Sequence, residues 1–146
     1  MSSAPTFGTQ VIGQTEKALN AILDRELDGT GLTEPQWVSL TIAVMTSGTL
    51  ERVALVSRVG GALKIGDAEA AARLNELADA GLLGLTEGDH SPVSVTDAGR
   101  RLHGQVRTAV AEITHRLWGD LPAEDLATTG RVLRTVLDRA NAELSG

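Results

Sequence analysis

The chain has 146 residues and a mass of 15.3 kDa, which fits one domain that can bury a hydrophobic core without crosslinks. Hydrophobic residues make up 42% and charged residues 22%, a balance that argues against a disordered chain and against a membrane protein. No cysteine is present, which excludes disulfides, thiolate metal sites and thiol nucleophiles. The net charge of −6, taken alone, argues against binding to nucleic acid.

The core composition favours helices. Only three residues are aromatic, against 20 leucines and 19 alanines, so aliphatic side chains must fill the core. Because leucine and alanine are also strong helix formers, we expect a mainly α protein of the α+β class.

Two helices are predicted in the first third of the chain. Apolar residues recur at helical spacing over residues 11–27, until the glycine-containing loop 28–31 interrupts the pattern. A second helix is predicted to start at Thr33, which has the spacing of a capping box with Gln36. We expect this helix to end near Ser47-Gly48.

The next two predicted helices are short and closely joined. The third covers about residues 50–63, with Val53 among its inward residues, and its end is weakened by Gly60-Gly61. After a turn at residues 64–66, Asp67 is expected to cap a fourth helix that ends before Gly81. Two short helices joined by so tight a turn indicate a helix-turn-helix.

A hairpin and two long helices complete the predicted pattern. Apolar residues alternate at Leu83 and Leu85 and again at Val93 and Val95, which predicts a small hairpin whose loop is rich in turn formers. Thr96 is expected to cap a fifth helix over residues 97–118. In that helix Gly99 and Gly104 are predicted weak points, each costing about 1 kcal/mol relative to alanine. Pro122 is expected to start the last helix.

This order predicts a central unit at residues 33–96 between helical arms at residues 1–32 and 97–146. The arms carry apolar stripes that need a cover. Since the central unit is small, we expect that cover to come from the same helices of a second chain in a two-fold dimer.

Three segments of the sequence, LTEPQWVSL, EAAARLNELADAGLL and VSVTDAGRRL, resemble the MarR family of winged helix-turn-helix transcriptional regulators. They occur in the family's order and separations, and the similarity extends over about residues 10–144. The resemblance implies a winged helix-turn-helix fold with flanking dimerisation helices, about six helices and one small hairpin. It also implies a homodimer that binds double-stranded DNA at a pseudo-palindromic site, and most simply a bacterial repressor.

The fourth predicted helix would be the recognition helix. Its residues Glu69, Ala72 and Arg73 share a face away from the core, so in a major groove Arg73 would pair with guanine, Glu69 with cytosine and Ala72 with a thymine methyl. The alternative is that Glu69 only complements the helix dipole and forms an ion pair with Arg73. Phosphate contacts are expected from Arg52, Arg58 and Lys64.

The wing departs from the family pattern. Family members carry an Asp-x-Arg pattern at the wing tip, whereas residues 87–92 read Glu-Gly-Asp-His-Ser-Pro and contain no arginine. His90 would be the wing's remaining contact with DNA, unless it is a solvated loop residue. Residues 48–101 also hold six basic against eight acidic residues, so we expect the wing to contribute less to binding than the wings of relatives do.

The resemblance further implies a cleft for a small aromatic or anionic effector. The matching positions, drawn from the first, second and fifth predicted helices, are Gln14, Trp37, Leu40, Thr41 and Arg107. Trp37 has the alternative role of a core anchor.

The sequence contains no catalytic signature, so we expect neither an enzyme nor a cofactor. His103 and His115 are twelve residues apart, about 120° around a helix, and therefore do not form a metal site within one chain. The first residues have neither a basic segment nor an apolar run, which predicts a cytoplasmic protein. The rival function is a winged-helix protein that has lost specific DNA readout and binds a protein partner through its acidic surface.

Overall fold

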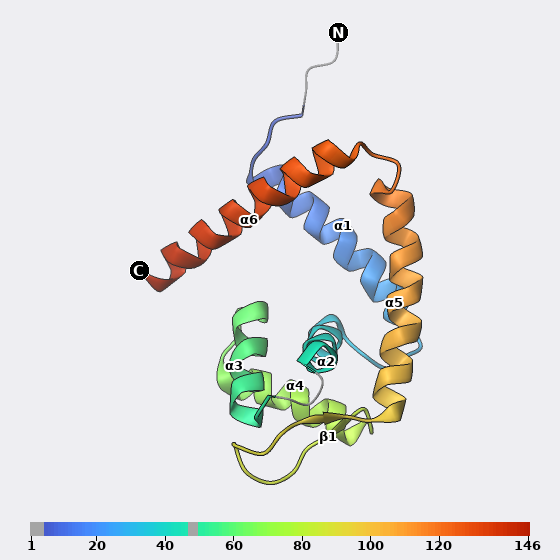
Figure 1. The fold of residues 1–146 in the computed structure, drawn as a ribbon, viewed down its shortest axis with the longest axis vertical. Helices are drawn as coiled ribbons and strands as arrows, with labels where there is room; N and C mark the ends of the chain where they lie inside the picture. The colour runs from blue at the N-terminus through green and yellow to red at the C-terminus, as the bar shows by residue number, and fades with distance from the viewer. Residues whose placement is uncertain (1–4, 47–49) are drawn as a thin grey trace. The chain divides into compact units, whose positions relative to one another are not determined.

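The computed structural model describes residues 5–46 and 50–146 (Figure 1). The elements follow the predicted order: α1 (Thr9–Leu27), α2 (Glu34–Thr46), α3 (Arg52–Leu63), α4 (Asp67–Asp79), β1 (Leu83–Gly84), β2 (Ser94–Val95), α5 (Asp97–Trp118) and α6 (Ala123–Ser145). The mainly helical fold class is confirmed, and the expected end of the second helix at Ser47-Gly48 lies outside the described residues. The chain divides inside α5 into two compact units, residues 1–110 and residues 111–146.

Helix ends follow the predicted capping chemistry at two of three places. Gln36 N donates to Thr33 Oγ1 at 3.4 Å and Thr33 N donates to Gln36 Oε1 at 2.9 Å, which confirms the capping box. The Thr96 hydroxyl caps α5 by accepting from Gly99 N at 3.0 Å. The predicted Asp67 cap is wrong, because Gly66 occupies the capping position and Asp67 is the first helical residue, where its charge complements the helix dipole.

The core of the first unit lies between α2, α3, α4 and the hairpin. Its fully or nearly fully buried residues are Leu40, Ala43, Leu55, Val59, Ala70, Leu74, Leu77, Leu82, Leu83 and Val93. The predicted inward position of Val53 is wrong, since that side chain is 46% exposed. Leu55 and Val59, one helical turn apart, face the core instead, and Val53 lies two residues away on the opposite side of α3.

The turn between α3 and α4 depends on a close backbone approach. Lys64 adopts a left-handed conformation with φ 58°, and Ile65 N donates to Gly60 O at 3.0 Å. A Cβ on Gly60 would lie 3.0 Å from the carbonyl oxygen of Ile65. A side chain at position 60 would therefore crowd this turn, so Gly60 does more than weaken the end of the helix.

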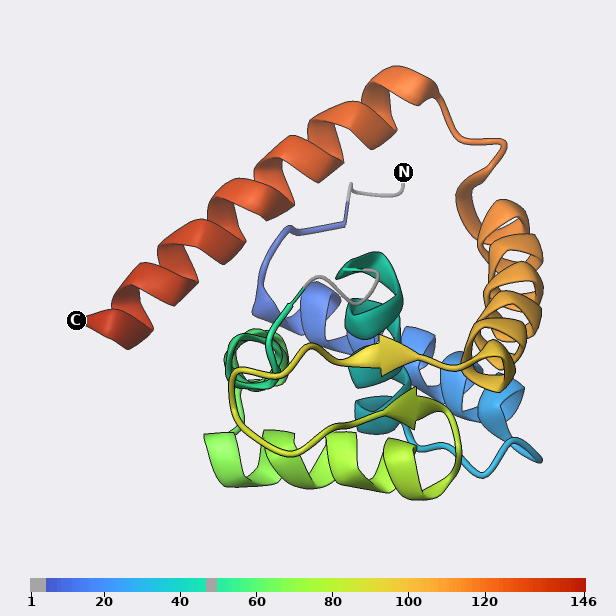
Figure 2. The ribbon, with the colours of Figure 1, turned by 60° about the horizontal axis from the view of Figure 1, so that its bottom comes forward.

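The hairpin is smaller than the alternation of apolar residues predicted. Strands β1 and β2 pair antiparallel with Leu83 opposite Val95 and Gly84 opposite Ser94, so Leu85 and Val93 lie in the connecting loop. We call this loop, residues 85–93, the wing loop. Figure 2 shows it running back beside α3, where an isolated bridge joins Glu51 to Pro92.

The second unit consists of the end of α5 and the whole of α6. No residue of α6 is buried, and its large apolar side chains at positions 132, 133, 136 and 137 recur at helical spacing. Gly130 does not interrupt the helix.

The two glycines of α5 are not equivalent, which corrects the expectation that both are weak points. A Cβ on Gly99 would overlap the carbonyl oxygen of Leu82, whereas a Cβ on Gly104 would meet nothing within 4 Å. Gly99→Ala should lower the free energy of unfolding by about 1–3 kcal/mol through overpacking. Gly104→Ala should raise it by about 1 kcal/mol, because alanine is the better helix former.

Urea denaturation at one fixed protein concentration measures both changes against the unmodified chain. Equal effects of the two substitutions would contradict the close contact between Gly99 and Leu82.

Candidate nucleic-acid interface

Helix α4 is seated on α2 and α3 by one apolar face. Ala70, Leu74 and Leu77 have no exposed surface, and α4 contacts both neighbouring helices extensively. The side of α4 opposite these three buried residues carries the residues that we call the outer face: Ala68, Glu69, Ala72, Asn75, Glu76 and Asp79. In Figure 2 this helix lies along one edge of residues 1–110, and four residues of the outer face are exposed: Ala68, Glu69, Asn75 and Asp79.

The outer face has three carboxylates and no arginine or lysine. Arg73 lies to its side, with 29% of its side chain exposed. Its Nη2 donates to Glu76 Oε2 at 3.1 Å, and its Nε lies 2.8 Å from Glu76 Oε1 without the direction of a hydrogen bond. The expected ion pair between Arg73 and Glu69 is therefore wrong in its partner: in this structure Arg73 pairs with Glu76, one turn later.

Glu76 also joins α4 to the start of α2. Gln36 Nε2 donates to Glu76 Oε1 at 2.9 Å, so one carboxylate holds both Gln36 and Arg73. The hydrogen bond from Gln36 and the nearby Arg73 guanidinium lower the pKa of Glu76. We call Gln36, Arg73 and Glu76 the Arg73 clamp, because Glu76 pairs with this guanidinium and Gln36 donates to Glu76.

Asn75 is a residue of the candidate interface that sequence reasoning missed. Arg52 Nη2 at the start of α3 donates to Asn75 Oδ1 at 2.8 Å. The two residues are 23 positions apart, so only the packing of α3 on α4 reveals the pair. The available signal was that Asn75 follows Ala72 by three residues and shares its side of the helix.

The other predicted phosphate contacts lie on α3 and its turn. Arg58 is exposed on α3, and Lys64 is exposed in the turn, where its Nζ donates to Gly61 O at 3.0 Å. Glu69 and Ala72 lie on the outer face, as expected from the spacing, with Glu69 exposed and Ala72 half-buried.

The wing loop caps the start of α3. Arg52 N donates to Ser91 O and Val53 N to Asp89 O, both at 2.9 Å. These two N–H groups have no partner within their own helix, and the wing carbonyls satisfy them. His90 Nδ1 lies 2.9 Å from Glu51 Oε2, and this hydrogen bond raises the pKa of His90. The wing loop is therefore held against α3 by contacts along its length.

A second cluster lies between α2 and α5. The rings of Trp37 and His103 are stacked with centroids 4.8 Å apart and planes inclined by 18°. His103 is 6% exposed, and burial together with the nearby Arg107 lowers its pKa. The Thr41 hydroxyl, one turn after Trp37, is buried and has no hydrogen-bond partner in the described part of the chain.

The structure thus joins only some of the predicted effector residues. Trp37 and Arg107 come together through His103, which sequence reasoning had considered only as a metal ligand. Leu40 is completely buried in the core, and Gln14 is exposed on α1, where no described contact joins it to the cluster.

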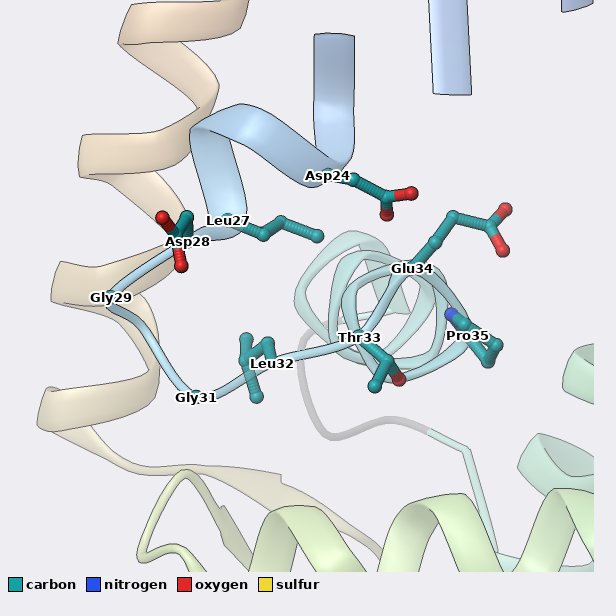
Figure 3. A pocket seen from close by; sticks show the side chains of 9 residues that line it. All are labelled: Asp24, Leu27, Asp28, Gly29, Gly31, Leu32, Thr33, Glu34 and Pro35. Atoms are coloured by element: carbon teal, nitrogen blue, oxygen red, sulfur yellow. The ribbon is translucent and has the colours of Figure 1, made fainter. Parts of the chain in front are cut away.

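A groove of about 610 Å³ lies elsewhere, at the loop between α1 and α2 (Figure 3). It contains the carboxylates of Asp24, Asp28 and Glu34 and none of the predicted effector residues. Burial and the neighbouring Asp24 and Glu16 raise the pKa of Glu34. This concentration of acid makes the groove unsuited to an anionic effector.

Neither a metal site nor a membrane span is found in the described ranges. Within residues 5–46 and 50–146, no group of three or more histidine, aspartate or glutamate side chains could hold a metal ion. Over the same ranges, no helix is long and apolar enough to cross a bilayer.

No family model matches the sequence, and no curated protein matches it significantly. Solved structures do match. A MarR protein from Peptoclostridium difficile aligns with a TM-score of 0.77 at 16% identity, covering 98% of this chain and 97% of that chain. The chain has the fold of MarR-family transcriptional regulators.

Two further proteins of this fold were crystallised with bound molecules. The Mycobacterium tuberculosis MarR family protein Rv2887 in complex with DNA aligns with a TM-score of 0.66 at 21% identity, covering 92% of this chain and 98% of that one. CouR from Rhodococcus jostii RHA1 bound to p-coumaroyl-CoA aligns with a TM-score of 0.72 at 18% identity, covering 86% and 88%. Rv2887 was also crystallised with p-aminosalicylic acid.

The buried His103 should make the stability of this MarR fold depend on pH. Because its pKa is lowered in the folded chain, the unfolded chain takes up the proton first as the pH falls below about 6.5. The stability contributed by neutral His103 is therefore lost progressively below that pH. His103→Phe keeps a ring against Trp37 and removes the titration.

We expect the phenylalanine variant to lose less stability than the unmodified chain between pH 7 and pH 5. Urea denaturation across this range, at constant protein concentration, measures the difference. An unchanged pH dependence would mean that His103 is not buried against Trp37 in its neutral form.

Proposed function

We propose that the chain is a dimeric, sequence-specific DNA-binding transcriptional repressor of the cytoplasm, and not an enzyme. Its DNA affinity is set by a small aromatic or anionic effector, and its wing contributes little to binding. One observation carries this proposal: the outer face of α4 is open on a rigid support, in a fold shared with a regulator crystallised on DNA.

The dimer is supported by the uncovered apolar side chains of α6. Val132, Leu133 and Leu137 are each about two-fifths or more exposed, and a second copy of the chain would cover them. In a two-fold dimer the two α4 helices would read half-sites about 34 Å apart, one turn of DNA, so the target would be a pseudo-palindrome.

Contacts with DNA are assigned from the outer face and its surroundings. Arg52, Arg58 and Lys64 would bind phosphates, while Glu69 and Ala72 would meet base edges. Arg73 would reach a base only after leaving Glu76, so the Arg73 clamp opposes base readout in the free protein. His90 would bind a phosphate only after leaving Glu51.

The effector site is assigned to the cluster around Trp37. Its stacked rings offer an aromatic surface, Arg107 offers a positive charge, and the Thr41 hydroxyl offers an unused hydrogen bond. An effector that binds better to a form with a different spacing of the two α4 helices would shift the population away from the DNA-competent form.

Selection of binding sites from a random DNA pool tests the function. We expect an enriched pseudo-palindrome whose half-sites are centred about one DNA turn apart. Arg73→Ala should weaken this preference, because one base contact is lost. If the selected pool shows no sequence preference over the starting pool, specific readout is contradicted.

A protein partner is the second candidate function, and the three carboxylates of the outer face favour it. The Arg73→Ala result separates the two candidates. Specific binding lost on this substitution supports base readout, whereas unchanged binding favours contacts with phosphates alone or the protein partner.

Glu76→Gln should raise affinity for DNA by about three- to tenfold, because it removes a negative charge near the phosphates and releases Arg73. Asp79→Asn is the matched control, since it removes a charge from the same outer face without touching the Arg73 clamp. Fluorescence anisotropy with the selected site measures both variants. An effect of Glu76→Gln no larger than that of Asp79→Asn would show that the clamp does not restrain Arg73.

A further inference from the structure

The hydrogen bond between Arg52 and Asn75 fixes the orientation of the Asn75 amide. A guanidinium group has donors and no acceptor, so only the amide oxygen can face Arg52. Asn75 Oδ1 accordingly lies 2.8 Å from Arg52 Nη2. The Asn75 side chain is exposed, and no other contact of its amide is found within residues 5–46 and 50–146. Its Nδ2 group, with two N–H donors, is therefore available to a partner.

The structure describes every residue of the outer face. Among their side chains, only that of Asn75 can donate a hydrogen bond. Ala68 and Ala72 offer methyl groups, and the three carboxylates offer acceptors. The nearest alternative donor on α4, the Arg73 guanidinium, is held by Glu76. A base edge that docks on this face therefore meets a donor at Asn75.

An asparagine in this fixed orientation reads bases differently from a free one. A free asparagine pairs with adenine by accepting from N6 through its oxygen and donating to N7 through its nitrogen. Arg52 already donates to one of the two lone pairs of that oxygen and fixes the direction of the amide, which disfavours the two-bond pair with adenine. Guanine presents the acceptors N7 and O6, which match a group that only donates.

We propose that Asn75 is a specificity-determining residue that selects guanine in the major groove, and that Arg52 is the positioning residue that disfavours adenine. This inference rests on the proposed DNA-binding function. It adds to that function the base that is read and the reason for the choice.

The test first compares the base preferences of four proteins by selection from a random DNA pool. Affinity is then measured for each protein on four DNA sites that differ only in the base pair assigned to Asn75. The proteins are the unmodified chain, Asn75→Ala, Arg52→Met and Arg58→Met. Arg58 lies on the same helix as Arg52 and makes no described contact with Asn75, so its substitution controls for loss of one positive charge.

The unmodified protein should prefer guanine over adenine by about tenfold at one position of each half-site. Asn75→Ala should abolish the preference there and leave the other positions unchanged. Arg52→Met should move the preference at that position from guanine toward adenine, because the amide is then free to present both its oxygen and its nitrogen. Arg58→Met should lower affinity for all sequences and leave the preferred bases unchanged.

Two kinds of failure are distinguishable. If Arg52→Met lowers affinity uniformly and keeps every preferred base, Arg52 acts as a phosphate contact only and the inference is overturned, while the proposed function stands. The same holds if Asn75→Ala leaves the preferred bases unchanged. If the unmodified protein enriches no sequence, the proposed function fails, and the inference fails with it.

Discussion

The seating of α4 on α2 and α3 is the constraint on which the rest of the interface depends. Ala70, Leu74 and Leu77 face inward with no exposed surface, and burial of each leucine side chain is worth about 1.5–3 kcal/mol. Since successive residues of a helix differ in direction by about 100°, these three positions also decide where every other α4 side chain points. They direct Asn75 outward beside Arg52, and they place Arg73 beside Glu76, to which Gln36 also donates.

The same constraint bears on how an acidic chain can have the fold of MarR-family regulators. The positive charges of the interface lie on α3 and its turn, at Arg52, Arg58 and Lys64, and not on the outer face. The carboxylate of Glu76 is neutralised by Arg73 within α4. The wing loop uses its carbonyl groups to cap α3, so it stabilises the helix start and does not extend as an arm. The net charge of −6 is therefore a poor guide to the local field at α4.

Much of the fold could be predicted because local chemistry determines it. The capping box at Thr33, the Thr96 cap and the helical spacing of apolar residues act within one or two turns, and these predictions are confirmed. The errors arose where tertiary contacts override local rules. Gly99 looked like a weak helix residue, yet the carbonyl of Leu82 requires a glycine there. Val53 looked inward, yet the packing of α3 buries Leu55 and Val59 instead.

The candidate site was less predictable for the same reason. Arg73, Glu69 and Ala72 could be placed on α4 by counting residues. Glu76, which pairs with Arg73, is in turn bonded by Gln36 of α2, and the partner of Asn75 comes from α3. The contact between Trp37 and His103 joins residues 66 positions apart, which no periodic pattern indicates. Pairs formed across such separations become visible only when the helices are packed.

The central claim is that α4 reads DNA while the wing loop stays on α3. Amide hydrogen exchange of the protein, measured with and without its selected DNA site, tests this claim most directly. The account predicts that DNA slows exchange over residues 67–79 and at the start of α3. It also predicts that the amides of Arg52 and Val53 are protected before DNA is added, because wing carbonyls already accept from them. DNA protection confined to the wing loop, or rapid exchange of both amides in the free protein, would contradict it.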